Sequence, residues 1–207
     1  MVAAGYDNGD VKVLDLRTNK LFFEQNVKNG VCSVEFDRND IKINKLVVTT
    51  LESRYRVYDL KTKHIAEGFP FLTVDALNPS KSMTKSMTNP LSNTANAVDH
   101  KKGSRGTTIW RVRHLPQNRD VWVTTSGNGC ASIWTYQYPD ERVIVDEKGH
   151  KKGVMGEVTL LSDHAVSTLS TQPIVSWDWN RSKTGLAAMA SLDQTIQIVV
   201  VTKLNKL

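Results

Sequence analysis

The sequence predicts an all-β fold made of a repeated unit, and three observations predict it. Four short segments alternate apolar and polar residues with a period of two, which is typical of a strand with one buried face; they are residues 9–15, 53–59, 129–135 and 194–200. A turn residue stands six positions before the large residue near the end of each segment; these pairs are Asn8 and Leu14, Glu52 and Tyr58, Asn128 and Trp134, and Asp193 and Val199. Helical periodicity is scarce throughout the chain.

The turns and the strands before them repeat as well. Asn8-Gly9 and Asn128-Gly129 are Asn-Gly pairs, which suit a two-residue hairpin in which both central residues have positive φ. Apolar stretches precede the four turns at residues 2–4, 46–50, 121–125 and 186–190. From the alternation, the buried residues of the four segments are expected to be Val11 and Val13, Tyr55 and Val57, Ala131 and Ile133, and Ile196 and Ile198.

Three of the units have a further strand upstream, and one has a candidate strand downstream. Residues 31–36, 109–114 and 174–179 align with one another, and residues 20–27 follow the first unit. The unit is thus three or four antiparallel strands, and Leu14 and Tyr58 stand 44 residues apart. That period matches one blade of a WD-repeat β-propeller, and a β-sandwich is the alternative that the alternation alone leaves open.

The repeats are degenerate, and the later intervals are longer than one period. The closing Trp-Asp of the motif is replaced by Leu14-Asp15, Tyr58-Asp59, Trp134-Thr135 and Val199-Val200. We expect one incomplete propeller over residues 1–207, with blades at about 1–28, 29–68, 107–142 and 171–207. A Ser-, Thr- and Asn-rich stretch at 80–97 is expected to be a disordered insertion, and 143–170 an inter-blade segment with candidate strands at 142–145 and 157–161.

Composition and motifs favour a binding scaffold over an enzyme. The net charge is +6. No cluster reaches five like charges and none has interleaved aromatic residues, so the sequence does not favour a nucleic-acid surface. There is no apolar stretch long enough to span a membrane, and Cys32 and Cys130 stand far apart, which favours a reducing compartment. The five histidines have no metal-site spacing, and no nucleotide-binding glycine motif occurs. We therefore predict no catalytic residue, no cofactor and no metal ligand.

Trp110, Arg111 and Arg113 are the candidate protein-binding residues. Propellers use the rim where connecting loops converge, and tryptophan and arginine are enriched at binding hot spots. Strict alternation places Trp110 and Val112 on one face of the strand and the two arginines on the other. A place for Trp110 in the core between blades is the alternative.

Several runs outside the generic repeat positions resemble one family. Residues 3–10, 28–38, 112–119, 169–174 and 193–206, which include RHLPQNR and VTKLNK, are similar to the Monad-type WD-repeat proteins. The resemblance implies a cytoplasmic co-chaperone adaptor that helps to preassemble and stabilise axonemal dynein heavy chains, together with a prefoldin-like complex and AAA+ ATPases. It also implies an association with cilia or flagella. A peptide-reading WD-repeat scaffold in a chromatin- or ubiquitin-linked complex is the alternative function.

The resemblance also bears on the architecture. It implies a seven-bladed propeller of which this chain is the C-terminal portion, about three and a half to four blades. A blade buries its two faces against its neighbours, so an open array is expected to expose an apolar face at each end.

Overall fold

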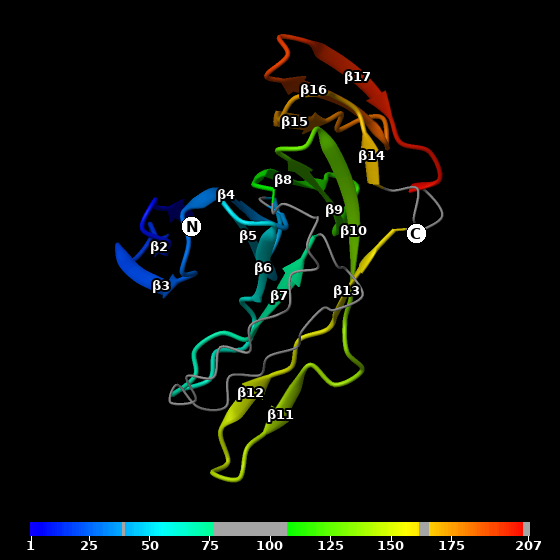
Figure 1. Cartoon of the computed structure of the whole chain (residues 1–207). Helices are drawn as coiled ribbons and strands as arrows, with labels where there is room; N and C mark the ends of the chain where they lie inside the picture. The colour runs from blue at the N-terminus through cyan, green and yellow to red at the C-terminus, as the bar shows by residue number, and fades with distance from the viewer. Residues whose placement is uncertain (39, 77–106, 162–165, 205–207) are drawn as a thin grey trace, which may run out of the picture.

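Short turns join neighbouring strands into four antiparallel sheets that follow one another along an arc (Figure 1). The computed structural model describes residues 1–38, 40–76, 107–161 and 166–204. The first sheet has the order β1-β2-β3 and the second the order β4-β5-β6-β7. Their strands are β1 Val2–Gly5, β2 Asp10–Asp15, β3 Lys20–Asn26, β4 Val31–Phe36, β5 Lys45–Thr50, β6 Arg54–Asp59 and β7 Phe71–Asp75.

The third and fourth sheets follow the same plan. In the third sheet β8, β9 and β10 are consecutive, and both β13 and β14 pair with β10; the fourth sheet has the order β15-β16-β17, and β11 and β12 form a separate hairpin. Their strands are β8 Ile109–Leu115, β9 Asn118–Ser126, β10 Cys130–Gln137, β11 Val143–Val145, β12 Lys151–Gly153, β13 Glu157–Leu160, β14 Val166–Thr168, β15 Ile174–Trp179, β16 Leu186–Ser191 and β17 Ile196–Val200.

The strand assignments differ from the expected blades at two ends. The second sheet extends past residue 68, because β7 adds a fourth strand at Phe71–Asp75. The segment 143–170 does more than connect blades, because β13 and β14 complete the third sheet. The insertion expected at 80–97 lies outside the described residues. Within the described part of the chain, no helix has the length and apolar character needed to cross a membrane.

The same turn joins β1 to β2, β9 to β10 and β16 to β17. The N–H of Gly9, Gly129 and Gln194 donates to the carbonyl three residues earlier, and these three residues have φ of 87°, 77° and 66°. The side chains of Asn8, Asn128 and Asp193, one position earlier, accept the N–H two residues ahead. The expected pair of positive φ angles is therefore wrong: one residue takes the left-handed conformation, and the asparagine contributes its side-chain oxygen.

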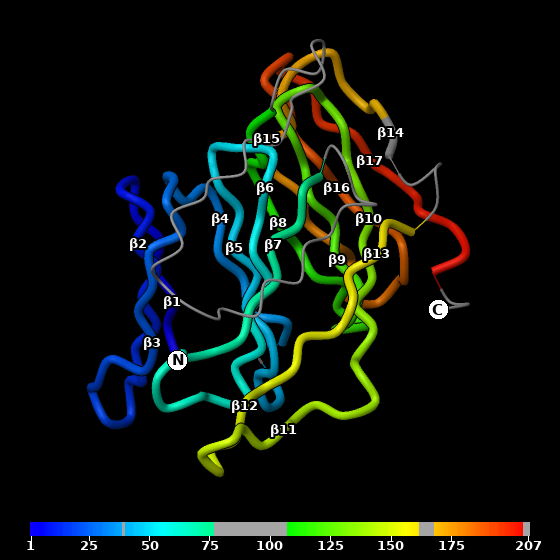
Figure 2. The backbone as a smooth tube through the Cα atoms, turned by 60° about the horizontal axis from the view of Figure 1, so that its bottom comes forward, coloured from blue at the N-terminus to red at the C-terminus, as the bar shows by residue number. Residues whose placement is uncertain are grey.

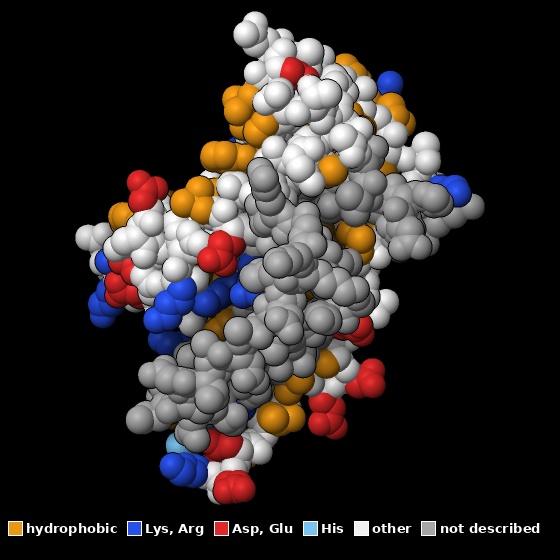
Figure 3. Space-filling model, in the orientation of Figure 1, with side chains coloured by type: hydrophobic (Ala, Val, Ile, Leu, Met, Phe, Trp, Pro, Cys, Tyr) orange, Lys and Arg blue, Asp and Glu red, His pale blue; other side chains and the backbone are white. Residues whose placement is uncertain are grey.

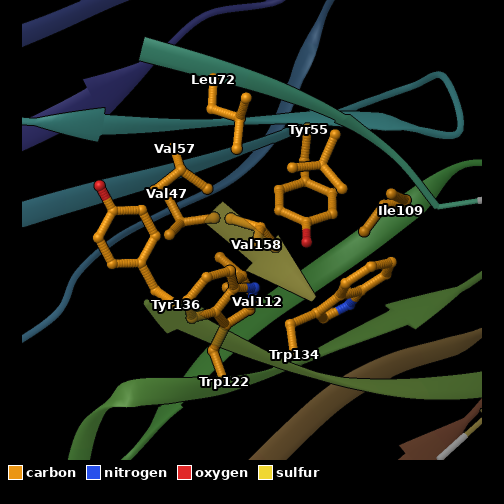
Figure 4. Packing of buried hydrophobic residues seen from close by; sticks show 11 residues of the cluster. Val47, Tyr55, Val57, Leu72, Ile109, Val112, Trp122, Trp134, Tyr136 and Val158 are labelled. Atoms are coloured by element: carbon orange, nitrogen blue, oxygen red, sulfur yellow. The ribbon is translucent and has the colours of Figure 1, made fainter. Parts of the chain in front are cut away.

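Three apolar clusters fill the spaces between successive sheets, so the core lies between blades. The middle cluster joins β5, β6 and β7 to β8, β9, β10 and β13, and Tyr55, Trp122 and Trp134 meet edge to face within it (Figure 4). The Trp134 indole N–H donates to Thr124 Oγ1 at 2.8 Å, so the buried nitrogen is paired. The flanking clusters join the first sheet to the second and the third sheet to the fourth.

Each middle sheet is buried on both faces, whereas the alternation indicated one buried face. Leu46 and Val48 of β5 pack toward the first sheet, while Val47 packs toward the third. In β10, Ala131 and Ile133 pack toward the fourth sheet and Trp134 packs toward the second. Every residue of β5 is buried, because it is sandwiched between two neighbours.

A polar bridge also joins the second and third sheets. Lys45 is fully buried, and its Nζ donates to Asp120 Oδ1 at 2.5 Å and to the Tyr138 hydroxyl at 2.6 Å, with Asp37 Oδ2 at 3.7 Å. Burial lowers the pKa of Lys45, and the two carboxylates act against that shift. The arrangement gives the buried ammonium the partners that its desolvation requires.

The two end sheets expose apolar side chains. Ile196 and Ile198, which were expected to be buried, are 78% and 70% exposed on β17, and that prediction is wrong. The alternation of β17 is intact, but no described residue covers its outward face. At the other end Val2 and Leu21 are exposed, and apolar side chains are visible at both ends of the arc (Figure 3). Exposed apolar side chains thus occur at both ends, although the outward face of the first sheet also carries the Lys12–Glu24 ion pair.

Removal of Trp134 should destabilise the chain far more than removal of an end-sheet residue. We expect Trp134→Ala to lower the free energy of unfolding by about 3–5 kcal/mol, because the substitution leaves a cavity between two sheets. Ile196→Ala, at an exposed position, should change it by less than about 0.5 kcal/mol. Guanidinium denaturation measures both values, and similar losses would contradict this core assignment.

The end faces should drive self-association. We expect the Ile196→Thr, Ile198→Thr double variant to weaken association by more than about tenfold, since burial of one isoleucine is worth about 1.5–3 kcal/mol and 1.4 kcal/mol is a factor of ten. Threonine retains the preference for strands. Sedimentation velocity measures the change; a wild-type chain that stays a dilute, monodisperse monomer with a cooperative thermal transition would count against the idea.

Candidate protein-binding site

The first strands of three sheets, β4, β8 and β15, lie next to one another on the inner side of the arc (Figure 2). Each pairs with the strand that follows it, and each carries a register shift after its first residue. At each shift the second residue of the strand has no partner in the register: Cys32 in β4, Trp110 in β8 and Val175 in β15. A β-bulge re-aims the side chains around it, so these strands begin with a shared irregularity.

The bulge corrects the expected orientation of Trp110. Ile109 and Val112 both enter the core between the second and third sheets, which strict alternation does not allow for residues three apart. Trp110 is the extra residue between them and is not part of the core cluster that contains Val112. It is half-buried, and no hydrogen bond from the described residues reaches its buried indole nitrogen.

Arg113 connects three sheets. Its Nη1 donates to Glu35 Oε1 of β4 at 3.0 Å, and its Nε donates to the Trp177 carbonyl of β15 at 3.2 Å. Its own carbonyl accepts the indole N–H of Trp179 at 3.2 Å. The side chain is only 32% exposed, and its donors are largely committed to structure.

The carboxylate of Glu35 organises the same strands. Oε2 accepts the backbone N–H of His114 at 2.7 Å and lies 3.0 Å from His114 Nδ1, while Oε1 accepts from Arg113. His114 is buried, and its Nδ1 is the nitrogen that carries the proton toward the carboxylate. One carboxylate therefore holds the second sheet against the third at their inner strands.

Arg111 differs from Arg113 because its side chain makes fewer hydrogen bonds. It is half-buried, and its buried Nε has no hydrogen-bond partner in the part of the chain that the structure describes. Burial and then the neighbouring Arg113 lower the pKa of Arg111, while Glu35 and Asp178 act to raise it. Arg111 is thus a half-buried cation near two carboxylates.

The structure therefore brings the three predicted residues onto one strand but separates their roles. Trp110 and Arg111 are half-buried with one buried nitrogen each that is unpaired among the described residues, whereas Arg113 holds neighbouring sheets together. Glu35 was not identified as a site residue from the sequence, although a charged residue on a predicted inner strand is an available signal. The sequence spacing also missed a group with the composition of a metal site, His64, Asp146 and His150.

Comparison with known proteins gives relatives that cover the whole chain. No model of a known protein family matches it. Dynein axonemal assembly factor 10 of Homo sapiens is 44% identical over 207 residues, which is 100% of this chain and 49% of that protein. The proteins of the same name from Xenopus tropicalis and Chlamydomonas reinhardtii are 45% and 39% identical, over 100% and 98% of this chain and 49% and 48% of each protein. These proteins are homologues of the chain. The chain spans about half the length of these curated relatives, and they confirm the resemblance drawn from its residues.

Solved structures show the fold alone. A chain of the mitotic checkpoint complex matches with a TM-score of 0.60 at 13% identity, over 97% of this chain and 47% of that one. The Cps50 (Swd1) β-propeller domain of Myceliophteria thermophila matches with a TM-score of 0.52 at 12% identity, over 97% and 49%. The predicted fold class, an incomplete WD-repeat β-propeller, is confirmed.

Loss of Glu35 should cost stability, whereas loss of Arg111 should not. Glu35→Ala leaves the Arg113 guanidinium and the His114 N–H without their partner, so we expect the free energy of unfolding to fall by about 1–3 kcal/mol. Arg111→Ala should change it by less than about 0.5 kcal/mol. Urea denaturation of the two variants tests this division, and an equal loss in both would contradict it.

Proposed function

We propose that the chain is part of a non-enzymatic protein-interaction scaffold that acts in the preassembly and stabilisation of axonemal dynein heavy chains. The observation that carries the proposal is the 39–45% identity, over nearly the whole chain, to proteins named dynein axonemal assembly factor 10. The propeller fold supports a role in binding, since it presents loops and strand edges on a rigid frame. Because the chain spans about half of each relative, the activity is proposed for the complete protein.

In this proposal the scaffold is a co-chaperone adaptor in the cytoplasm of ciliated or flagellated cells. Its partners are a prefoldin-like complex, AAA+ ATPases and dynein heavy chains. Trp110 and Arg111 on the inner strand β8 form the contact with one partner, because both side chains are only half-buried and Arg111 carries a charge beside Glu35 and Asp178. Arg113 acts indirectly, by holding β4, β8 and β15 in place.

A chimera tests the proposal in a cell that assembles axonemal dynein. In Chlamydomonas reinhardtii lacking its relative, the matching half of that relative, which is 39% identical, would be replaced by this chain. We expect the chimera to restore dynein heavy-chain abundance in the cytoplasm and dynein arms on axonemes. A chimera that accumulates to normal levels yet restores neither would overturn the proposal and favour a peptide-reading scaffold in another complex.

Two variants of the chimera separate binding from stability. The Trp110→Ala, Arg111→Ala double variant should accumulate normally but lose partner capture by at least about tenfold, as expected when a hot-spot pair worth more than 1.4 kcal/mol is removed. Glu35→Ala should instead lower chimera abundance. Partner capture is measured by quantitative pull-down against chimera level, and full capture by the double variant would remove these residues from the site.

A further inference from the structure

The β11–β12 hairpin follows β10 and precedes β13 in the chain, and it contacts a loop of the second sheet. That loop, residues 60–70, connects β6 to β7. Arg142 Nη2 donates to Asp59 Oδ2 at 2.9 Å, and Lys152 Nζ lies 2.8 Å from Glu67 Oε2. The hairpin projects at the lower end of the molecule in Figure 1, where histidine, lysine and acidic side chains gather in Figure 3. Two connections from successive sheets are thus held together away from the inner strands.

Three side chains at this contact have the composition of a metal site. His64 comes from the loop, and Asp146 and His150 come from the hairpin 82 residues later. Asp146 Oδ2 lies 3.2 Å from His64 Nε2 and 3.5 Å from His150 Nδ1, and the three ligand atoms all lie within 4.8 Å of one another. The His64 side chain is 8% exposed and the His150 side chain is 41% exposed. The group is therefore shielded from solvent at His64 and open to solvent at His150.

Hydrogen bonds within the hairpin turn orient the carboxylate of Asp146. Asp146 Oδ1 accepts the backbone N–H of Lys148 at 2.9 Å and of His150 at 2.7 Å. The turn itself closes through the Gly149 N–H, which donates to the Asp146 carbonyl at 3.0 Å, and Gly149 has φ of 80°. These bonds occupy one carboxylate oxygen and leave Oδ2 directed at the two imidazoles. Hydrogen bonds of this kind orient the ligands of metal sites.

We propose that His64, Asp146 and His150 bind Zn²⁺ and thereby fasten the β11–β12 hairpin to the neighbouring sheet. Two imidazole nitrogens and one carboxylate oxygen suit Zn²⁺, whereas Ca²⁺ and Mg²⁺ prefer oxygen ligands throughout. Tetrahedral zinc with bonds of about 2.0 Å places its ligand atoms roughly 3.3 Å apart, close to the two distances from Asp146 Oδ2. The fourth position belongs to water, on the open side beside His150.

Zinc binding requires a defined change of tautomer. His64 Nδ1 accepts the backbone N–H of Glu67 at 3.1 Å, so without metal the ring proton is on Nε2 and points at Asp146. Zinc takes the Nε2 lone pair, and the proton moves to Nδ1. The contact with the Glu67 N–H must then open, since two N–H groups cannot face each other.

Metal titration of the chelator-treated 207-residue chain tests the proposal. Calorimetry with Zn²⁺ should give one site per chain, and Co²⁺ should give the visible absorption of a tetrahedral centre. We expect His150→Gln and Asp146→Asn each to weaken binding by more than about 100-fold, beyond the roughly 10- to 100-fold cost of altering an outer-shell partner. Both positions are partly exposed, so these variants keep the test valid where His64→Gln fails to fold.

A control and a spectroscopic signature distinguish zinc binding from a purely structural network. Lys152→Met removes the ion pair between hairpin and loop but no ligand, so its zinc affinity should stay within about tenfold of the wild type. Long-range ¹H–¹⁵N spectra should show the His64 proton on Nε2 without metal and on Nδ1 with Zn²⁺. No zinc binding by the wild-type chain, unchanged binding by His150→Gln and Asp146→Asn, or an unaltered His64 tautomer would overturn the proposal. The result is independent of any role in dynein assembly.

Discussion

The structure depends on the packing of one sheet face against the next. The two middle sheets bury apolar side chains on both faces, each face against a different neighbour. Tyr55, Trp122 and Trp134 fill the space between the second and third sheets, and Trp134 keeps the tryptophan of the closing Trp-Asp pair. The same constraint explains the ends of the arc, because a face without a neighbour leaves Ile196 and Ile198 exposed however regular its strand is.

Polar contacts add specificity to this apolar stacking. Glu35, Arg113 and the carbonyl of Trp177 join three inner strands, and buried Lys45 joins two sheets elsewhere. Such contacts fix how neighbouring sheets are aligned, since their geometry is narrower than that of aliphatic packing. They also decide which inner-strand residues remain available to a partner. Arg113 is held by hydrogen bonds to two neighbouring sheets, whereas Arg111 and Trp110 are half-buried side chains without such bonds from the described residues at their buried nitrogens.

Much of the fold could be predicted from the sequence because the alternation and the turn residues repeat at fixed offsets. The strands around Val11, Tyr55 and Ile133 lie where the pattern places them. The bulge at Trp110 could not be predicted, since it adds one residue without changing local composition, and it invalidates strict alternation there. Nor could spacing reveal the group formed by His64 and Asp146, because only the packing of two sheets brings residues 82 apart into contact. Local patterns thus predicted strands, and tertiary packing decided the sites.

Hydrogen exchange along the chain is the most direct test of the claim that face-to-face stacking sustains the fold. Protection of a backbone amide reports the free energy of the opening that exposes it. We expect the slowest exchange in β5, β6, β9 and β10, which are covered on both faces, and much faster exchange in β1–β3 and β16–β17 at the ends of the arc. Uniform protection across all four sheets, or strongest protection in β17, would contradict it.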